Sequence, residues 1–271
     1  MEIFTILMNK SSMDMKELPD EIVNLTVTSP PYGTIKDYSE DTEQIGNFKG
    51  DLQIEKLKEV FKEVYRLTKD GGFCAINIGE YIQEEGYLYP FSAKLTLMMI
   101  EIGFKYIRNI IWKKPSSQQN IFSKFKHHYN MDTEYIIIFR KQTFFKEEEE
   151  KRDYSDKELL HNVWNIQPNT RTSEDDHIAI FPEELPKRII NLYSKEGDII
   201  LEPFTGSGTT INIAYKLQRH SIGYEINKEY CKLIINNINP KQKRLDGLNR
   251  LFFYGENGNY IIPEDILKCL K

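Results

Sequence analysis

Segments of two kinds alternate along most of the chain, and this alternation restricts the fold more than any other feature. Short runs rich in apolar and β-branched residues have the length and composition of buried strands. Longer runs carry apolar residues three or four positions apart, which is typical of amphipathic helices. Strands that alternate with helices predict a doubly wound α/β domain, in which helices cover both faces of a mostly parallel sheet. The expected strands are residues 21–28, 73–78, 106–112, 134–139, 198–201 and 221–224, and the expected helices are residues 51–67, 90–102, 182–194 and 209–217.

The size and composition of the chain favour one large domain. Its 271 residues can bury a substantial core, and 40% of them are hydrophobic. No apolar run reaches the roughly 20 residues that a transmembrane helix needs, and the first residues lack the basic region and cleavage site of an export signal. Cys74, Cys231 and Cys269 are scattered, which gives neither a disulfide framework nor the spacing of metal ligands. We therefore expect a cytoplasmic protein with no membrane segment and no bound metal.

A glycine-rich turn follows the expected strand at residues 198–201. The sequence IILEPFTGSGTT predicts a strand, a tight turn and a helix, and Gly206 and Gly208 would let a ligand approach the backbone where that helix begins. The turn lacks the third glycine of a dinucleotide fingerprint and the lysine of a phosphate-binding loop, which disfavours a pyrophosphate ligand. Glu225 ends the next strand about 20 residues later, where a carboxylate can accept hydrogen bonds from both ribose hydroxyls. Together the two features predict an adenosine-like cofactor without phosphates, although either one alone is also common in ordinary connections.

The turn Thr28-Ser29-Pro30-Pro31-Tyr32 is the most informative segment of the chain. Two consecutive prolines fix the backbone and supply no amide hydrogen, so the turn presents its acceptors in a fixed direction. The hydroxyl of Ser29 and the carbonyl of Pro30 could accept hydrogen bonds from the amine of a base, which would favour the tetrahedral nitrogen that attacks a methyl sulfonium. Tyr32 could stack on a base turned out of the duplex. The alternative interpretation is a stiff turn at a strand end with a core aromatic residue.

The two turns can act together only if they lie side by side. In a doubly wound sheet, the first strands of the two halves are neighbours at the topological switch point, where ligands bind. We therefore expect the strands that end at Thr28 and at Glu202 to be adjacent, so that a base and a methyl donor meet between them.

At these residues the chain resembles the amino-methyltransferases of DNA, in particular the permuted group in which the catalytic motif precedes the cofactor motif. TSPPY is similar to the catalytic motif, LEPFTGSGTT to the cofactor loop, GYEIN to the ribose-binding strand end, and residues 177–194 to the motif that opens a helix at the methionine end of the cofactor. The similarity covers residues 1–236. Two features differ, because the family usually has Asp where this chain has Glu202, and the acidic residue that reaches the adenine is missing from residues 8–11.

The resemblance implies a doubly wound, seven-stranded and mostly parallel sheet with one antiparallel strand, and S-adenosylmethionine as the cofactor. It divides the chain into a methyltransferase domain at residues 1–240 and a C-terminal extension at residues 241–271, for which packing, dimerisation and DNA binding are open roles. Within the domain it implies a catalytic half at residues 1–114, an inserted target-recognition segment at about residues 115–164 and a cofactor half at residues 165–240. The implied catalytic residues are Ser29, Pro30, Pro31 and Tyr32, and the implied cofactor-binding residues are Phe181, Leu185, Glu202, Phe204, Thr205, Gly206, Ser207, Gly208, Thr209 and Glu225.

The first residue of the catalytic motif bears on the choice of target base. In the family that the chain resembles, a leading Ser such as Ser29 mostly accompanies methylation of cytosine N4, and a leading Asp mostly accompanies methylation of adenine N6. We therefore expect a site-specific DNA methyltransferase that modifies the exocyclic N4 amine of a flipped cytosine, as part of a restriction-modification system. The alternatives are an adenine-N6 enzyme, an amine methyltransferase acting on RNA or protein, and a cofactor-binding DNA-recognition subunit without catalytic activity.

A local excess of positive charge marks the expected DNA-binding segment. The chain as a whole carries a net charge of −5, but residues 101–130 hold six Lys or Arg side chains against one Glu. Such side chains neutralise phosphates, and the amides of nearby Gln and Asn residues can contact base edges. The expected partners are double-stranded DNA and a cognate restriction endonuclease acting on the same site, and the protein is expected to be a monomer or a homodimer. The candidate DNA-binding residues are Lys113, Lys114, Lys124, Lys126, His127 and His128.

Overall fold

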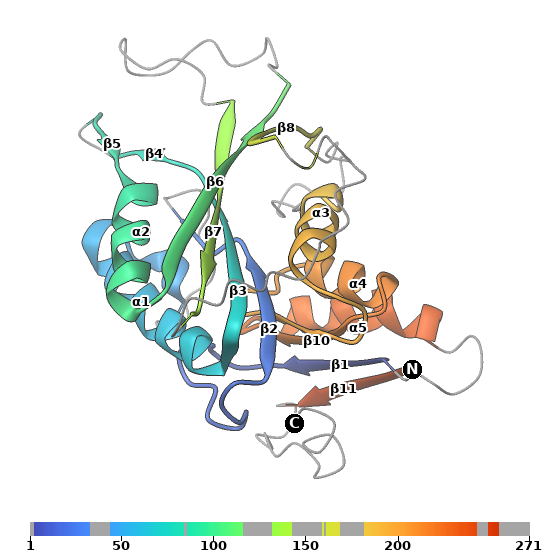
Figure 1. Cartoon of the computed structure of the whole chain (residues 1–271). Coiled ribbons are helices and arrows are strands. Elements are labelled where there is room, and N and C mark those ends of the chain that lie inside the picture. Colours follow the sequence, from blue (N-terminus) through green and yellow to red (C-terminus); the bar gives the residue numbers. More distant parts are fainter. Residues whose placement is uncertain are drawn as a thin grey trace.

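One large sheet with helices on both of its faces forms the body of the protein (Figure 1). The six strands and four helices predicted from the sequence are all present, and most of their ends differ from the prediction by one or two residues. The computed structural model describes residues 3–32, 44–83, 86–115, 132–142, 159, 161–168, 182–242 and 249–254.

The elements follow one another along the chain in two groups. The first group contains β1 (Ile3–Met8), β2 (Val23–Thr28), the 3-10 helix η1 (Ile45–Asn47), α1 (Gly50–Leu67), β3 (Thr68–Ile78), β4 (Tyr81–Ile82), β5 (Leu88–Tyr89), α2 (Phe91–Ile102), β6 (Lys105–Lys113), β7 (Thr133–Arg140) and β8 (Val163–Asn165). The second group contains α3 (Glu184–Tyr193), β9 (Ile199–Glu202), α4 (Thr209–Lys216), β10 (His220–Tyr224), α5 (Lys228–Gln242) and β11 (Asn249–Tyr254). β4 and β5 form a separate two-stranded sheet.

The start of β3 differs from the prediction. The expected helix at residues 51–67 ends where α1 ends, but residues 68–72, which were expected to separate it from the strand at residues 73–78, lie inside β3, which begins at Thr68. Gly71 has a φ of +84°, and a Cβ on Gly72 would lie 2.8 Å from Cγ2 of Thr68, so both positions favour glycine. The register of β3 against β2 shifts at the same place. The glycine pair therefore permits a bulge within the strand rather than a turn before it.

The large sheet has the strand order β11-β1-β10-β9-β2-β3-β7-β6-β8. Of these nine strands, only β7 runs antiparallel to its neighbours β3 and β6. The predicted class, a doubly wound and mostly parallel sheet with one antiparallel strand, is therefore confirmed. The sheet has nine strands rather than the seven expected, because β8 pairs with β6 at one edge and β11 pairs with β1 at the other.

The added strands bear on the predicted division of the chain. β11 comes from the C-terminal extension at residues 241–271, so this part of the extension packs onto the sheet edge. The predicted target-recognition segment at residues 115–164 contains β7 and the start of β8, both of which belong to the sheet. Residues 116–131 and 143–158 of that segment lie outside the described part of the chain, and a recognition role for them stays a prediction.

The core lies on both faces of the sheet, as a doubly wound fold requires. α1 and α2 cover one face, where Leu57 and Phe61 are fully buried against apolar strand residues. α3 and α4 cover the other face, where Leu185 and Ile189 belong to a second core cluster (Figure 1). The strands β2, β3 and β7 contribute residues to both clusters, which explains why apolar residues occur on both of their faces.

The switch point of the fold lies between β2 and β9. From β2 the chain passes through α1 to β3 on one side, and from β9 it passes through α4 to β10 on the other. β2 and β9 are parallel neighbours, with Leu25 opposite Ile200 and Thr26 opposite Leu201. The prediction that the strands ending at Thr28 and Glu202 are adjacent is therefore confirmed.

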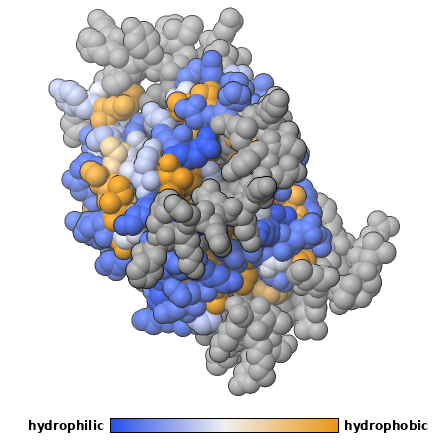
Figure 2. All heavy atoms as spheres, viewed as in Figure 1, coloured by the Kyte–Doolittle hydropathy of each residue, from blue (hydrophilic) through white to orange (hydrophobic). Residues whose placement is uncertain are grey.

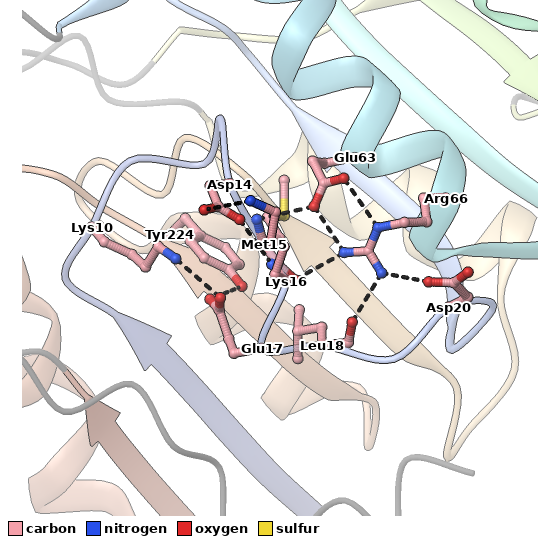
Figure 3. Close-up of polar contacts among 10 residues, drawn as sticks. All are labelled: Lys10, Asp14, Met15, Lys16, Glu17, Leu18, Asp20, Glu63, Arg66 and Tyr224. Carbon is pink, nitrogen blue, oxygen red and sulfur yellow. Dashed lines mark hydrogen bonds and ion pairs between the residues drawn. The ribbon is translucent and has the colours of Figure 1, made fainter.

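Residues 9–22, which lead from β1 to β2, are fastened to α1 (Figure 3). Arg66 donates hydrogen bonds to the backbone carbonyls of Met15 and Leu18, each at 2.9 Å, and to two carboxylates. The side chains of Met15 and Leu18 are almost completely buried in the core beneath α1. One arginine thus satisfies carbonyls of a segment that has no strand or helix of its own.

The described surface is mainly hydrophilic, with hydrophobic groups gathered chiefly on the side of α1 and α2 (Figure 2). Large apolar side chains are exposed there on α2 and β6, namely Leu97, Ile100, Tyr106 and Ile107. None of the helices that the structure describes combines the length and apolar character that crossing a bilayer requires.

The Arg66 contacts predict a clear stability difference between two positions of α1. We expect Arg66→Ala to lower the free energy of unfolding by about 1–3 kcal/mol, because it leaves two carbonyls without their charged donor. Lys62→Ala is the matched control, because it removes only an exposed ion pair with Glu59 and should cost less than about 0.5 kcal/mol. Urea unfolding of both variants measures the difference, and equal losses would show that Arg66 does not anchor residues 9–22.

Candidate active site

The carboxyl ends of β2 and β9 carry the two sequence motifs, and a hydrogen bond joins them. The hydroxyl of Thr28, the last residue of β2, donates to Oε1 of Glu202, the last residue of β9, at a distance of 2.5 Å. Ser29 follows Thr28 directly, and the glycine-rich loop follows Glu202. The structure therefore brings the predicted catalytic turn and the predicted cofactor loop together.

Glu202 is a buried carboxyl group whose hydrogen bonds all go to protein. Besides Thr28, its donors are the hydroxyl of Thr210 at 2.9 Å and the backbone amide of Phe204 at 3.1 Å. Burial raises the pKa of Glu202 to about 8, and the three hydrogen bonds oppose that rise. Within the described residues no basic side chain pairs with it. Glu202 was predicted to bind the cofactor, but its partners in the structure belong to β2, the loop and α4.

A side chain of α1 holds the predicted catalytic turn. Gln53 is fully buried in the first turn of that helix, and its Nε2 donates to the carbonyl of Pro31 at 3.1 Å and to that of Ile45 at 3.3 Å. Pro30 is buried, and Ser29 is partly buried. Within the described part of the chain, the Ser29 hydroxyl forms no hydrogen bond to protein.

Tyr32 lies between a phenylalanine and a glycine. Its ring centroid is 6.0 Å from that of Phe91, with an angle of 37° between the ring planes. On another side it touches Gly79, where a Cβ would come within 3.2 Å of its Cε2 and its hydroxyl oxygen. The absence of a side chain at Gly79 therefore leaves the space that the Tyr32 ring occupies.

The loop after β9 approaches the sheet closely. Gly206 and Gly208 have φ values of +54° and +85°, which favour glycine. The backbone amide of Thr205 donates to the carbonyl of Tyr224 on β10 at 2.9 Å. A Cβ on Gly223 would lie only 2.6 Å from the hydroxyl of Thr205, so the neighbouring strand also needs glycine there. Ser207 and Thr209 then form a hydroxyl pair 3.2 Å apart where α4 begins.

Glu225 lies at the end of β10 beside this loop. One of its carboxylate oxygens accepts a hydrogen bond from the amide of Gly206 and the other from the amide of Asn227, each at 2.7 Å. Burial raises the pKa of Glu225 to about 7, against the effect of these hydrogen bonds. Each oxygen keeps a lone pair for another donor, so the carboxylate can accept two further hydrogen bonds from a ligand.

The segment after β1 supports Glu225 from the opposite side. Asn9 donates from Nδ2 to the carbonyls of Glu225 and Ile226, at 2.9 and 3.0 Å. Tyr224, one residue earlier, donates from its hydroxyl to Glu17 at 2.6 Å (Figure 3). The end of β10 is therefore positioned by the side chains of Asn9 and Glu17, which belong to the segment between β1 and β2.

Two predicted cofactor residues belong to the segment around α3. Leu185 is fully buried in the core cluster beneath α3. Phe181 lies outside the described residues. Direct contacts of these two residues with a cofactor stay predictions.

The predicted DNA-binding lysines at the end of β6 differ in their surroundings. Lys113 is exposed. Lys114 instead forms an ion pair with Glu134 on β7, and its Nζ lies 4.9 Å from the ring centroid of Trp112. Glu134 in turn accepts a hydrogen bond from the buried Asn77 at 2.6 Å. The other candidates, Lys124, Lys126, His127 and His128, lie outside the described residues.

Gln53 and Glu134 were not predicted from the sequence. Gln53 stands on the apolar stripe of α1, in line with Leu57 and Phe61, and a polar residue in that position was the available signal. Glu134 is the one acidic residue of β7 and stands just before its run of apolar residues. Neither pattern reveals which atoms these side chains contact, because their partners come from distant segments.

The arrangement combines two kinds of acceptor at one edge of the sheet. The Ser29 hydroxyl and the Pro30 carbonyl can accept hydrogen bonds from an amine, and Glu225 can accept them from sugar hydroxyls. Between them lies the hydrogen bond from Thr28 to Glu202, which joins the ends of β2 and β9; we call this junction the seam. Such a site suits a reaction between an amine and a nucleoside-like cofactor.

Comparison with known proteins supports this interpretation. A family model described as DNA methylase matches residues 23–236. The Type II methyltransferase M.MjaI of Methanocaldococcus jannaschii is 35% identical, and the match covers 85% of this chain and 90% of that protein. The Type II methyltransferase M.MthZI of Methanothermobacter thermautotrophicus is 33% identical, and the match covers 86% of this chain and 76% of that protein.

Solved structures share the fold. A putative DNA modification methylase from Thermus thermophilus, crystallised with S-adenosyl-L-methionine, has a TM-score of 0.69 at 24% identity, covering 93% of this chain and 100% of the other. The PvuII DNA methyltransferase, described as cytosine-N4-specific, has a TM-score of 0.71 at 19% identity, covering 93% and 97%. With a family match over most of its length and relatives above 30% identity, the chain belongs to the DNA methylase family, the S-adenosylmethionine-dependent group that its motifs predicted.

Proposed function

We propose that the protein transfers a methyl group from S-adenosylmethionine to the exocyclic N4 amine of a cytosine turned out of a DNA duplex. The observation that carries this proposal is the hydrogen bond between Thr28 and Glu202, which joins the turn beginning at Ser29 to the loop that follows β9. Two reactants bound at these two segments would meet at the switch point of the sheet.

The residues beside the loop suit S-adenosylmethionine. Both carboxylate oxygens of Glu225 accept a backbone amide at 2.7 Å and have capacity for further donors, which would suit the two hydroxyls of a ribose. There is open space beside Gly206, since the atom of the described residues nearest to a Cβ placed there would be the carbonyl oxygen of Phe204, at 4.0 Å. When bound, the cofactor supplies an electrophilic methyl group on a sulfonium. The other residues that we propose around it, as in the sequence prediction, are Phe181, Leu185, Glu202, Phe204, Thr205, Ser207, Gly208 and Thr209.

The catalytic turn would activate the amine of the base. An amine attached to an aromatic ring is a poor nucleophile, because its lone pair is delocalised into the ring. Hydrogen bonds from its N–H groups to the Ser29 hydroxyl oxygen and the Pro30 carbonyl favour a tetrahedral nitrogen, and hence the transition state over the ground state. Tyr32 would stack on the extruded base and offset part of the unstacking cost. The proton leaves after the methyl group has been transferred, so no strong general base is required.

Cytosine is proposed as the target because serine leads the catalytic motif. In the family that the sequence resembles, Ser at the position of Ser29 mostly accompanies N4 methylation. The PvuII enzyme, which shares the fold, is described as cytosine-N4-specific. Methylation of adenine N6 is the alternative within the same family.

A restriction-modification system is the proposed setting. The relatives M.MjaI and M.MthZI carry the name Type II methyltransferase. We propose that the protein acts in the cytoplasm on double-stranded DNA, beside a restriction endonuclease that cleaves the same site. Lys113, Lys114, Lys124, Lys126, His127 and His128 are the proposed DNA contacts.

Methylation of genomic DNA tests the reaction and the base together. Incubation with S-adenosylmethionine, followed by hydrolysis to nucleosides and mass spectrometry, should give N4-methylcytosine. N6-methyladenine would support the alternative target, and DNA without any new methyl group would contradict the proposed activity.

Removal of the Ser29 hydroxyl should slow this reaction. We expect Ser29→Ala to lower the rate of methyl transfer on the order of 10²-fold, because one acceptor for the base amine is lost. The affinity for S-adenosylmethionine and the thermal unfolding curve should stay at their wild-type values. Single-turnover assays measure the rate, and undiminished methylation by Ser29→Ala would remove Ser29 from the mechanism.

Cofactor affinity should rise with pH through the titration of Glu225. Burial raises the pKa of this group to about 7, and ribose hydroxyls donate to its ionised form, so cofactor binding below that pKa must release a proton. We expect the affinity for S-adenosylmethionine to increase about tenfold between about pH 6 and pH 8. Calorimetric titration in buffers of different ionisation enthalpy measures both the affinity and the proton release.

Two substitutions separate this effect from general effects of pH. Glu225→Gln should bind the cofactor more weakly, on the order of ten- to a hundredfold, and without the pH dependence. Glu229→Gln is the control, because Glu229 is exposed on α5 and, among the residues that the structure describes, forms an ion pair with Lys232 alone, so the pH profile of this variant should match that of the wild type. A pH dependence that persists in Glu225→Gln would contradict the ribose-binding role.

A further inference from the structure

We propose that Glu202 is a positioning residue, whose buried carboxyl group locks the catalytic turn to the cofactor loop so that the two reactants are aligned. This inference rests on the proposed function and gives Glu202 a role that does not require direct contact with the cofactor. The side chain is 4% exposed, and it receives hydrogen bonds from both sides of the switch point.

The backbone does not hold the two strands together at their ends. The pairing of β2 with β9 comprises Leu25 with Ile200 and Thr26 with Leu201, and it stops there. β2 continues to pair with β3 as far as Thr28, and β9 continues to pair with β10 as far as Glu202. The two strands therefore part at the point where ligands bind, and the Thr28–Glu202 hydrogen bond spans the opening.

The contacts of Glu202 reach both the proposed catalytic turn and the glycine-rich loop. Oε1 accepts from the hydroxyl of Thr28, which is covalently next to Ser29, and from the amide of Phe204, in the glycine-rich loop. Oε2 accepts from the hydroxyl of Thr210, in the first turn of α4. A displacement of the loop or of α4 would therefore be transmitted through one rigid carboxyl group to the residue that precedes Ser29.

The chemical nature of Glu202 argues for a role beyond packing. A buried carboxyl group without a basic partner costs free energy that an apolar side chain would not, even when its hydrogen bonds are made. Thr26, two residues before Thr28 on the same strand, shows the contrast: its hydroxyl is also buried but has no hydrogen-bond partner among the described residues. Of these two buried threonines of one strand, only Thr28 bonds Glu202.

Alignment matters strongly for a direct transfer between two bound reactants. The amine nitrogen and the methyl carbon must approach within about 3–3.5 Å in line, and a misplacement of about 1 Å can lower the rate a hundredfold. The lock would thus act on the rate of transfer more than on the affinity for either ligand.

Thr28→Val, with Thr26→Val as its matched control, tests the lock. Both substitutions replace a buried hydroxyl of β2 by a methyl group of similar size, but only Thr28→Val removes a donor to Glu202. We expect Thr28→Val to lower the single-turnover rate of methyl transfer about tenfold or more, while the dissociation constant for S-adenosylmethionine stays within about twofold of the wild-type value. Thr26→Val should transfer at the wild-type rate, and Thr28→Ser, which restores the hydroxyl, should recover most of the activity. Equal rates for Thr28→Val and Thr26→Val would overturn the proposal.

A second measurement does not depend on methyl transfer and decides the matter even if the wild-type protein methylates no DNA. Thr28 and Thr210 both bond Glu202, so the losses of unfolding free energy in Thr28→Val and Thr210→Val should not add in the double variant. The pair Thr26→Val and Thr210→Val should be additive. If the losses of unfolding free energy add in both pairs, the proposed role of Glu202 is overturned. If the wild-type protein is inactive but the losses in Thr28→Val and Thr210→Val do not add, only the proposed function is overturned.

Discussion

The hydrogen bond from the Thr28 hydroxyl to the Glu202 carboxyl group is the contact on which the site depends. Every parallel doubly wound sheet has a point where its two halves diverge, and the divergence creates room for ligands but also leaves strand ends without mutual backbone support. Here the side chain of Glu202 supplies that support across the seam. The ordinary rule that buried carboxyl groups need partners explains why both oxygens are bonded to protein.

Side chains from distant segments support the two ligand-binding turns around this seam. Gln53 holds the carbonyl of Pro31, and Asn9 holds the backbone at Glu225. Both are amides that donate to carbonyls which a tight turn leaves without a strand partner. These hydrogen bonds hold the backbone that carries the acceptors we propose for an amine and for a ribose, and fixed acceptors are the condition for electrostatic preorganisation.

Much of this organisation could be predicted from the sequence, because it depends on local patterns. The strand and helix periods, the double proline after Thr28 and the glycines of the loop are readable over a few residues, and the switch-point rule then places β2 beside β9. What could not be predicted depends on contacts between remote segments. The partner of Gln53, the three donors to Glu202 and the pairing of β11 with β1 have no local signature, and residues 70–72 look like a turn although they form a bulge. Glu202 itself was assigned from its motif, which indicates its position in the chain but not the direction of its carboxyl group.

A crystal structure of the protein with S-adenosylmethionine bound would show whether both reactants meet where β2 and β9 end. We expect the ribose hydroxyls within hydrogen-bond distance of Glu225 and the methyl carbon directed at the space above Ser29, with the Thr28–Glu202 hydrogen bond intact. A cofactor bound away from the glycine-rich loop, or one whose methyl group faces away from Ser29, would contradict this expectation.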